Sequence, residues 1–536
     1  MAEDFEVSEP WSGFVKFDRP AGRNPGEIAL MMFRCGFWLG VWILALAGGS
    51  RTVMAMSTGS GETHDRPNIL WIIVDDMSAD FGCYGSPEVN TPHVDGLARR
   101  GLRFEKAFVT APVCSPCRSA LITGMYQTSI GAHHHRSGRG ELKIQLPPGI
   151  RPIPALFQDA GYYTCCCNWP LRANRPGKTD YNFAWDRKIY DGGDWRERPA
   201  GQPFFAQVQL PGGKLRGGTQ ASADRLARRA VRELGSASPA DSVRLPPWYP
   251  DHPVLRQDRA AYLDSVRFTD LAVGRIIDQL RSDGDLGNTV VFFMTDHGIS
   301  HARAKQFLYD EGIHVPLVIA GPSIPVGTRD DLVEHIDLAA TSLALGGIPV
   351  PADMQSRDLL AHDYQPRSAV YAARDRCDET VDRIRCLRTD RYKYIRNGYP
   401  QRPWLQPNAY KDNKSVLRTL RVLHREGGLS AAQAMLLTGP RPVEELYDLQ
   451  ADPGELDNLA DDPAHRVTLA DLRQRLDQWV RETGDQGQQP EPDAMYQSDM
   501  DVYLGGLQSA KQPNRQRIEE IRENILLMQQ WQQSGK

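Results

Sequence analysis

A chain of 536 residues is too long for a disulfide-stapled mini-protein or a lone binding module, and at about 150 residues per domain it has room for several domains. The 63 Lys and Arg residues against 67 Asp and Glu residues give a net charge of −4, so no basic field favours nucleic acid or an acidic membrane as a partner. A hydrophobic content of 41% with 24% charged residues is ordinary for a globular chain with a large core, and we expect an enzyme.

The N-terminal part carries a pattern typical of export. Residues 35–47 form an apolar run that is too short to span a bilayer but fits the hydrophobic region of a signal peptide, and residues 53–55 (VMA) offer a small-residue cleavage site. We therefore expect residues 1–55 to be an N-terminal extension and signal peptide of a protein exported to the periplasm or the medium. A core helix is the alternative. Because the polar stretch before the run is long for a signal peptide, we take Met31 or Met32 as the hypothetical true start.

From residue 66 onward the pattern is that of an α/β protein. Four apolar runs of strand length are expected to be buried on both faces, at residues 68–74 (NILWIIV), 204–209, 289–295 (TVVFFMT) and 315–320. Residues 259–281 place their apolar side chains roughly on one face of a helix. Strands that alternate with helices predict an α/β fold with a large mixed, mostly parallel sheet sandwiched by helices.

The pattern changes near residue 366, where shorter and more charged β-like segments begin, at residues 369–373, 384–389 and 392–395. A helix is expected near residues 464–483. Residues 484–512 are polar and expected to be irregular, and residues 518–531 are expected to form a last amphipathic helix. The predicted division is a large domain, a smaller C-terminal α+β subdomain and a polar tail, at residues 66–365, 366–483 and 484–536.

The strongest local signal begins at Cys114 and ends at Gly124 (CSPCRSALITG). Ser115 can cap a helix that Gly124 ends, and Cys114 then lies just before the helix N-terminus, where the dipole and free N–H groups favour an anion. Arg118 lies about one turn further along and can reach the same point. The alternative is a zinc or redox pair of Cys114 with Cys117, but the sequence offers no matching second pair for four-ligand zinc.

Polar side chains follow two of the buried strands. Asp75 and Asp76 come directly after the first strand, and Asp296 and His297 come directly after the third. In open α/β sheets, ligands bind at the carboxyl ends of the strands. Hard oxygen ligands that converge there suit Ca²⁺ or Mg²⁺, although each pair alone is equally consistent with a solvated turn.

The Cys114 segment resembles the signature of the formylglycine-dependent (type I) sulfatases, which is Cys-x-Pro-Ser/Cys-Arg followed by Leu-x-Thr-Gly; Cys117 stands where most members have serine. The resemblance implies an alkaline-phosphatase-like fold. It also implies that a maturation enzyme oxidises Cys114 to formylglycine (3-oxoalanine), and that the hydrated aldehyde is the nucleophile. The implied ligands of a divalent cation, Ca²⁺ or Mg²⁺, are Asp75, Asp76, Asp296, His297 and the modified Cys114. His297 replaces the more frequent asparagine.

Two lysines extend the resemblance. Lys178, in a Gly-Lys-Thr-Asp segment, resembles a sulfate-binding lysine of the family, but Asp180 falls where the family often has histidine. Lys305, upstream of Tyr-Asp-Glu, resembles the second sulfate-binding lysine. Residues 133–135 are three consecutive histidines, which either supply the missing imidazole, with His135 as the candidate, or form a metal-like cluster without a role. The family's His-x-Pro leaving-group acid has no counterpart here, so the acid is unassigned, with Lys214 or Lys305 as candidates. The residues that the resemblance places around the charge of the sulfate are Arg118, Lys178 and Lys305.

The resemblance extends over residues 66–482. Its C-terminal part rests on residues 445–449 (ELYDL) and 452–455 (DPGE), and residues 130–135 and 177–183 look most like the heparan N-sulfatase (sulfamidase) branch. A charged loop at residues 374–383 either lines a pocket for a charged sugar or is a solvated face, and the solvated face is the favoured interpretation. Cys377 and Cys386 are considered as a disulfide pair.

We therefore predict an exported, metal-dependent sulfatase that cleaves an O–S or N–S bond of a sulfated saccharide, with Asp296 taking the proton of the nucleophile. Two alternatives stay open. One is a phosphonate or phosphodiester hydrolase on the same scaffold, and the other is a non-catalytic glycan-binding pseudo-sulfatase whose Cys114 is not oxidised. The expected partners are the sulfated carbohydrate and the formylglycine-generating maturation enzyme, with neither nucleic acid nor a stable membrane span.

Overall fold

The computed structural model describes residues 66–168, 170 and 176–536. The predicted signal peptide and start site lie outside these residues. Within the described part of the chain, no helix is long and apolar enough to cross a membrane.

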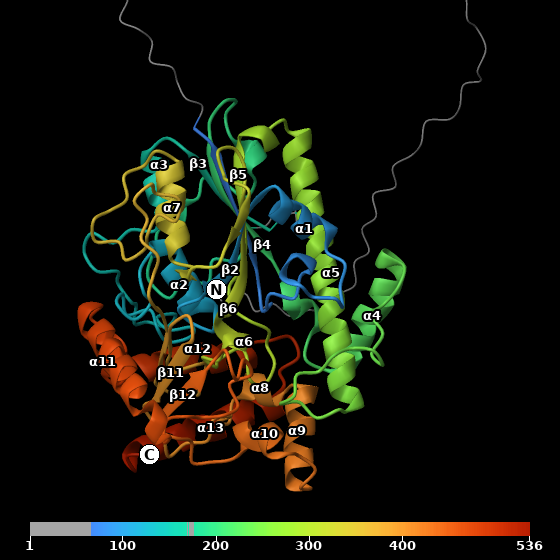
Figure 1. The fold of residues 1–536 in the computed structure, drawn as a ribbon, viewed down its shortest axis with the longest axis vertical. Coiled ribbons are helices and arrows are strands. Elements are labelled where there is room, and N and C mark those ends of the chain that lie inside the picture. The colour runs from blue at the N-terminus through green and yellow to red at the C-terminus, as the bar shows by residue number, and fades with distance from the viewer. Residues whose placement is uncertain (1–65, 169, 171–175) are drawn as a thin grey trace, which may run out of the picture. The chain divides into compact units, whose positions relative to one another are not determined.

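A mixed sheet forms the centre of the larger part of the fold (Figure 1). Within the described residues its eight strands are β1 (Asn68–Val74), β2 (Gly101–Phe108), β3 (Tyr163–Cys167), β4 (Phe204–Leu210), β5 (Thr289–Thr295), β6 (His314–Ala320), β7 (Gly327–Arg329) and β8 (Val333–Glu334). The order is β3-β4-β1-β5-β6-β2-β7, and β8 pairs with β2. Strands β3, β4, β1 and β5 are parallel, whereas β6 runs antiparallel to β5 and β2. The predicted fold class is confirmed.

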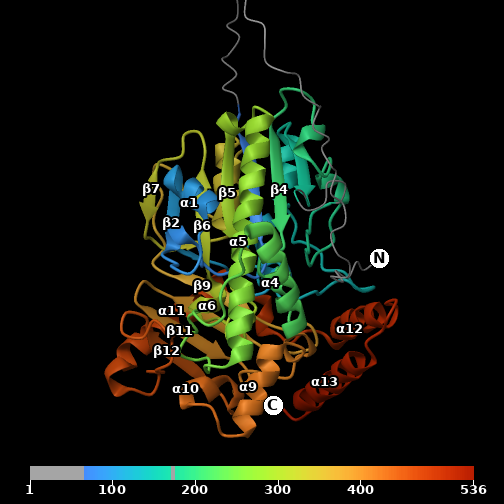
Figure 2. The same cartoon turned by 90° about the vertical axis from the view of Figure 1, so that its right-hand side faces the viewer.

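Helices cover both faces of this sheet (Figures 1 and 2). The α-helices of the described residues are α1 (Pro92–Arg99), α2 (Cys114–Thr123), α3 (Ile153–Asp159), α4 (Gln220–Leu234), α5 (Pro253–Ser282), α6 (Asp310–Ile313), α7 (Asp337–Leu345), α8 (Ala409–Asp412), α9 (Ser415–Arg425), α10 (Ala431–Ala434), α11 (Arg466–Glu482), α12 (Asp493–Gln508) and α13 (Arg515–Gln533). Trp71 of β1 shares one core with Phe157 of α3, and the next residue, Ile72, shares the opposite core with Val266 of α5. This alternation is why β1 reads as a continuous apolar run.

A second sheet, of four antiparallel strands, forms the C-terminal part. Its order is β12-β11-β10-β9, and its strands are β9 (Val370–Arg374), β10 (Ile384–Arg388), β11 (Tyr392–Asn397) and β12 (Glu444–Asp448). Helix α11 covers it, because Leu476 and Trp479 share a core with Leu387 and Tyr394. The expected smaller α+β region is therefore present, while the domain boundaries at residues 365 and 483 stay predictions.

The region expected to be irregular contains a helix, so that prediction was wrong. Helix α12 covers Asp493–Gln508 and lies beside α13 (Figure 2). Its Met500 shares a small core with Ile521 and Ile525 of α13. The apolar residues of α12 are spread around the helix rather than gathered on one face, and two consecutive glycines lower its helix propensity, so tertiary packing rather than local sequence stabilises it. Helix α13 itself agrees with the prediction for residues 518–531.

The carboxyl ends of β1, β4 and β5 meet at one edge of the large sheet. Val74 pairs with Leu210 of β4 and with Thr295 of β5. The N–H of Asp75 donates to the carbonyl of Leu210 at 3.0 Å, and the N–H of Asp296 donates to the carbonyl of Val74 at 2.9 Å. The parallel register therefore brings the residues that follow these three strands side by side.

Two glycines after β4 permit the close approach of the next segment to this edge. Gly212 has φ +49°, and a Cβ there would lie 2.2 Å from the carbonyl oxygen of Asp75. The N–H of Gly213 donates to the same carbonyl at 2.9 Å. Lys214 follows directly, so the glycines place its side chain against the end of β1.

We expect Gly212→Ala to destabilise the protein more than Gly201→Ala does. Gly201 also has a positive φ, of +78°, but nothing lies within 4 Å of its would-be Cβ. Both variants introduce left-handed backbone strain of about 1 to 2 kcal/mol, and Gly212→Ala adds an overpacking cost of about 1 to 3 kcal/mol. Urea unfolding followed by tryptophan fluorescence measures both changes. Equal shifts in the two variants would show that the close approach at Gly212 is unimportant.

Candidate active site

Helix α2 presents Cys114 at its N-terminus. The helix begins at Cys114 itself, with Val113 as N-cap, and ends at Gly124 with φ +65°. The expectation that Ser115 caps the helix was wrong, because its Oγ accepts instead from the backbone N–H of Arg136 at 2.8 Å. Every residue of α2 is buried, so the Cys114 thiol lies inside the molecule at the positive end of a helix.

Cys114 faces the ends of β1 and β5. Ligand atoms of Asp76, Cys114 and His297 all lie within 4.8 Å of one another. His297 Nε2 is 3.2 Å from Cys114 Sγ, 3.3 Å from Asp76 Oδ1 and 3.4 Å from Asp296 Oδ1. Its Nδ1 lies 2.9 Å from the Gly298 carbonyl, which orients the ring with Nε2 toward the acidic groups. The two predicted strand-end pairs therefore converge.

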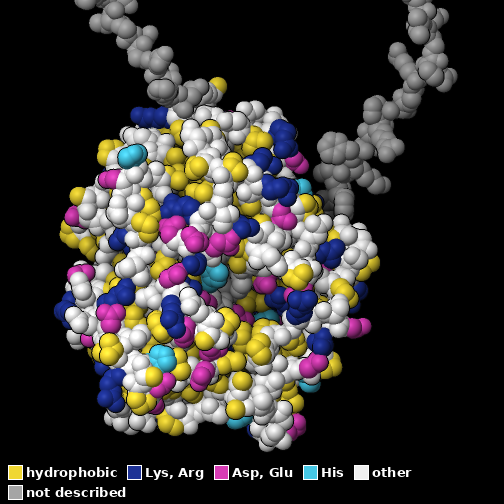
Figure 3. Space-filling model, viewed as in Figure 1, with side chains coloured by type: hydrophobic (Ala, Val, Ile, Leu, Met, Phe, Trp, Pro, Cys, Tyr) yellow, Lys and Arg dark blue, Asp and Glu magenta, His cyan; other side chains and the backbone are white. Residues whose placement is uncertain are grey.

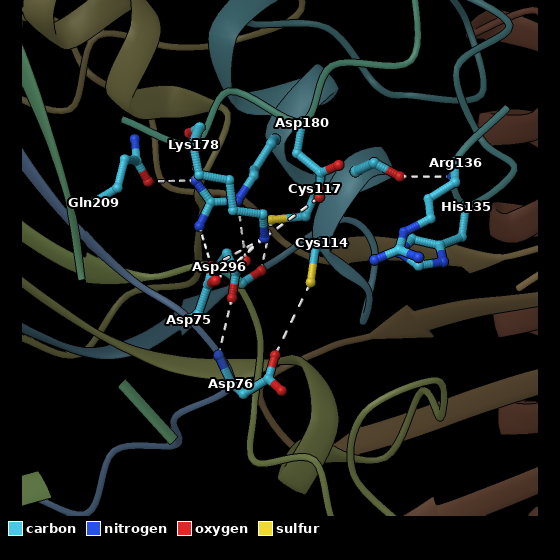
Figure 4. A network of polar contacts seen from close by, with 12 residues as sticks. Asp75, Asp76, Cys114, Cys117, His135, Arg136, Lys178, Asp180, Gln209 and Asp296 are labelled. Carbon is cyan, nitrogen blue, oxygen red and sulfur yellow. Dashed lines mark hydrogen bonds and ion pairs between the residues drawn. The ribbon is translucent and has the colours of Figure 1, made fainter. Parts of the chain in front are cut away.

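Four cationic side chains contact these groups, and Figure 4 shows one of them, Lys178, beside the carboxylates. Arg118 forms an ion pair with Asp75 and donates to Asp296 Oδ2 at 3.1 Å. Lys178 Nζ lies 3.2 Å from Asp75 Oδ2. Lys305 Nζ is 2.9 Å from Asp76 Oδ1 and 3.4 Å from Cys114 Sγ. The fourth cation is Lys214, which contacts Asp75 and approaches Cys114 Sγ to 3.7 Å.

These cations change the pKa values of the site. Burial raises the pKa of Asp75, but the charges of Lys178, Lys214 and Arg118 outweigh it and hold the value well below the ordinary one. Asp296 differs from Asp75. Burial, followed by the charges of Asp75 and Cys114, raises the pKa of Asp296 to about 7, although His297 and Arg118 oppose this.

The two cysteines of the motif lie in different environments. Burial raises the pKa of Cys114, yet the surrounding lysines and His297 bring it well below its ordinary value. Burial and then Asp296 raise the pKa of Cys117 well above it. The Cys117 thiol donates to the Asp296 carbonyl at 2.6 Å, and both cysteines are free. The structure therefore shows two free thiols whose pKa values shift in opposite directions, and no disulfide joins them.

The comparisons with known proteins agree with this geometry. The Sulfatase family model matches residues 67–348, slightly more than half of the chain, and the model "N-sulphoglucosamine sulphohydrolase, C-terminal" matches residues 297–416. An ulvan-active sulfatase of Formosa agariphila is 33% identical over 467 residues, which cover 80% of this chain and 77% of that protein.

The chain belongs to the sulfatase family and is a sulfuric ester hydrolase. The N-sulphoglucosamine sulphohydrolase of Homo sapiens is 26% identical over 78% of this chain and 90% of that protein. The fold is shared with a solved 2-O GAG sulfatase, which has a TM-score of 0.57 and 20% identity over 81% of this chain and 96% of that chain.

The side chains of this sulfatase fit a divalent cation. Three carboxylates and an imidazole converge beside Cys114, and carboxylate oxygens are the ligands that Ca²⁺ and Mg²⁺ prefer. The backbone N–H of Asp76 donates to Asp296 Oδ1 at 3.2 Å, so the backbone after β1 helps to fix the Asp296 carboxylate. Tyr410 adds a hydroxyl 3.4 Å from Asp76 Oδ2.

The structure places His135 at the sulfatase site, although its position in the sequence alone did not require this. Ligand atoms of His135, Asp180 and Cys114 lie within 4.8 Å of one another, and His135 Nδ1 is 3.0 Å from Asp378 Oδ1. The neighbouring His134 does not join the group, because its Nδ1 accepts from the backbone of Arg376 at 3.2 Å. One of the three consecutive histidines therefore faces Cys114.

The charged loop at residues 374–383 is not a solvated face, so the favoured interpretation was wrong. Most of its charged side chains are buried, including Arg374, Asp378 and Glu379. Cys377 and Cys386 are both free, so the disulfide pair that we considered is absent from the described residues. The loop borders the site through Asp378.

Sequence reasoning missed two further groups of the site. Gln209, at the end of β4, accepts from Arg118, and Tyr410 approaches from α8. The position of Gln209 at a strand end was a usable signal. No signal in the sequence pointed to Tyr410, because α8 joins the site only through tertiary packing.

We expect the unmodified Cys114 thiol to be alkylated faster than Cys117 at neutral pH. The lowered pKa leaves Cys114 as the thiolate, which is the reactive form. Lys305→Met removes one of the charges that lower this pKa, so it should slow the reaction, whereas Lys188→Met, at an exposed lysine away from the site, should not. Iodoacetamide labelling read by tandem mass spectrometry, on EDTA-treated protein from a host without the maturation enzyme, measures both. Equal rates for Lys305→Met and the parent protein would contradict the lysine's effect on the thiol.

Proposed function

We propose that this sulfatase releases sulfate from a sulfated saccharide, from either an O-sulfate or an N-sulfate, after Cys114 has been converted to formylglycine. The observation that carries the proposal is the buried Cys114 at the N-terminus of α2, with Lys214, Lys305 and His297 around its sulfur. The human relative's name is that of an enzyme acting on a sulfated amino sugar, and the matching C-terminal family model carries the same name.

The residues that would hold the cation are Asp75, Asp76, Asp296 and His297, with residue 114 beside them. When bound, Ca²⁺ or Mg²⁺ polarises the oxygens of the sulfate group. We favour Ca²⁺, because three carboxylates in loops at strand ends suit its flexible coordination. When formed, the hydrated formylglycine supplies the hydroxyl nucleophile.

The charged side chains have separate roles in sulfate binding and proton transfer. Arg118, Lys178 and Lys305 form the positive wall that binds the sulfate oxygens and stabilises the charge that develops on them. Asp296 accepts the proton of the nucleophile. For the leaving-group proton we favour Lys214 over Lys305, because Lys214 is partly exposed and Lys305 is buried.

His135 is our candidate for the second proton acceptor. The family often has a histidine where this chain has Asp180, and the Asp180 carboxylate is engaged with Arg139 and Lys178. The His135 ring reaches the vicinity of Cys114 from another segment, and Asp378 orients it through Nδ1. His135 therefore provides the imidazole, with Asp378 as its positioning residue.

Export and maturation complete the proposal. The apolar run at residues 35–47 supports export, and the Cys-x-Pro-Cys-Arg sequence supports recognition by a formylglycine-generating enzyme. Export would bring the enzyme to substrates outside the cytoplasm, such as a large sulfated saccharide.

Protein from its own host should carry an aldehyde in place of the Cys114 sulfur. Mass spectrometry of the tryptic peptide 107–118 measures this, and ion chromatography of sulfate released from O-sulfated and N-sulfated saccharides measures activity. Cys114→Ala should lower sulfate release by at least about 1,000-fold, because the nucleophile is lost. Cys83→Ala, at a thiol away from the site, is the matched control. EDTA should abolish release, and added Ca²⁺ should restore it.

Three results would contradict the proposal. An intact thiol with glycan binding that survives Cys114→Ala would favour the pseudo-sulfatase. Faster turnover of a phosphodiester than of any sulfate by several orders of magnitude would favour the phosphodiester hydrolase. Full activity in EDTA would contradict the metal site.

His135→Asn should lower kcat about 100-fold, the usual scale for loss of a proton-transfer group. Asp378→Asn should lower kcat less, because the imidazole remains but loses its orienting carboxylate, and it should also change the pH dependence of kcat. His133→Asn is the matched control, since no hydrogen-bond partner of His133 Nδ1 is found in the described part of the chain. Steady-state sulfate release measures all three variants. Equal effects of His135→Asn and His133→Asn would remove His135 from the mechanism.

A further inference from the structure

Arg118 is buried, so its orientation depends on partners from the protein. Water can solvate charged groups at the surface, as on the face in Figure 3, where basic, acidic and histidine side chains gather around a central hollow. The Arg118 side chain is only 3% exposed. Its Nε and Nη2 contact Asp296 and Asp75, while Nη1 donates to Gln209 Oε1 and lies 3.5 Å from the Lys178 carbonyl. Gln209 is thus a neutral side chain beside two charged ones.

Gln209 lies in β4, a strand that is buried on both faces. Gln207 is two residues away, so both amides point to the same face of the sheet. The two glutamines are 2% and 5% exposed, Gln207 being the lower. A buried amide is unfavourable unless its oxygen and its N–H groups have partners. Two amides in such a strand are therefore retained only where a hydrogen-bond network satisfies them.

A chain of hydrogen bonds satisfies both amides and has one direction. A guanidinium only donates, so Gln209 turns Oε1 toward Arg118 and Nε2 away from it. The Gln209 Nε2 donates to Gln207 Oε1 at 3.2 Å, and Gln207 Nε2 donates to the Tyr190 hydroxyl at 2.7 Å. The hydroxyls of Tyr190 and Tyr181 lie 2.6 Å apart. Figure 4 shows the Gln209 oxygen turned toward the charged cluster. The chain therefore joins Arg118 to the two tyrosines.

The tyrosine pair fixes the far end of this chain. The ring of Trp185 packs edge-on against both tyrosine rings, with centroids 5.3 Å from Tyr181 and 6.1 Å from Tyr190. Burial raises the pKa of both hydroxyls, so they stay neutral and keep their hydrogen bonds. The chain thus ends in packed aromatic side chains, which limits how far Gln207 and Gln209 can rotate.

A neutral acceptor suits an arginine that has to bind an anion. The carboxylates of Asp75 and Asp296 offset part of the Arg118 charge, and in our proposal they also hold the cation. Gln209 Oε1 fixes one edge of the guanidinium without placing a further negative charge beside the sulfate. It can therefore orient Arg118 and leave its charge available to the sulfate oxygens.

We propose that Gln209, held by Gln207 and the tyrosine pair, is a positioning residue that keeps the Arg118 guanidinium in the orientation that binds the sulfate oxygens. The inference rests on the proposed function. A guanidinium binds an oxyanion through N–H groups in a fixed planar arrangement, so a rotated guanidinium loses these bonds even though its charge remains.

Gln209→Met tests this role, because methionine is similar in size but lacks the acceptor. The KM for a sulfated saccharide and the inhibition constant of inorganic sulfate should both rise about 10-fold. Gln207→Met removes the next link and should raise both constants less. Gln127→Met is the matched control, since Gln127 is also buried but its amide bonds to Thr110.

These constants separate positioning from stability. A loss of folded protein lowers the measured kcat but leaves KM and the inhibition constant at the parent values. Gln127→Met should therefore leave both constants unchanged. Parent values of both constants in Gln209→Met would overturn the positioning role.

Combination with Arg118→Lys shows whether Gln209 acts through Arg118. Calorimetric titration of Ca²⁺-loaded Cys114→Ala chains with inorganic sulfate measures binding without turnover. Lysine has no guanidinium to orient, so Gln209→Met should change the dissociation constant less than about 2-fold when Arg118→Lys is present. An equal change with and without Arg118→Lys would overturn the proposal.

Crystal structures of the parent protein and Gln209→Met separate this inference from the proposed function. A guanidinium of Arg118 that moves or takes several positions in Gln209→Met would support the positioning role, even if the parent protein releases no sulfate from any saccharide. A guanidinium that keeps its parent position in Gln209→Met would overturn it, whether or not sulfate is released.

Discussion

Three carboxylates, those of Asp75, Asp76 and Asp296, are buried beside one another where β1 and β5 end, and the fold must neutralise them. Buried like charges are unfavourable unless each is paired and hydrogen-bonded. The register of the two strands leaves no way to separate them, because Val74 lies directly beside Thr295. The cations that contact these carboxylates are Arg118, Lys178, Lys214 and Lys305. They come from four separate segments, so neutralising this edge draws α2 and three loops onto the sheet.

The same balance prepares the site for an anion. Four cationic side chains face three carboxylates and a thiol whose lowered pKa makes it an anion. Conversion of that thiol to a neutral aldehyde hydrate would remove one negative charge from the cluster. The excess positive charge would then lie beside the nucleophile, where a sulfate ester must bind. Cationic side chains that already surround the reacting oxygens need little rearrangement during the reaction. Such preorganised electrostatic stabilisation is usually the largest contribution to catalysis.

Sequence reasoning found the part of the site that depends on strand ends and on one motif. Asp75, Asp76, Asp296 and His297 follow continuous apolar runs, and the ends of parallel strands coincide, so their convergence was predictable. Cys114 and Arg118 belong to a single helix turn, and that pairing also needed no tertiary information. The favoured interpretation of the charged loop failed for the opposite reason. A run of charged residues is usually solvated, and this one is buried by tertiary packing against α12, α13 and the segments of Gln406 and Arg441. Helix α12 itself has weak periodicity, so neither this helix nor the burial of the loop could be predicted from the sequence.

The position of the imidazole shows how one substitution is linked to distant segments. With aspartate at position 180, a carboxylate near Cys114 is held by Arg139 and Lys178, and in our proposal the imidazole comes from another segment. His135 can supply it only because Asp378 fixes its ring, and Asp378 is placed by a loop that α12 and α13 hold. A change at position 180 alone would therefore leave two groups competing for the same space. The aspartate, the histidine and the C-terminal helices therefore form one structural unit, which links the sheet edge to the C-terminal part of the chain.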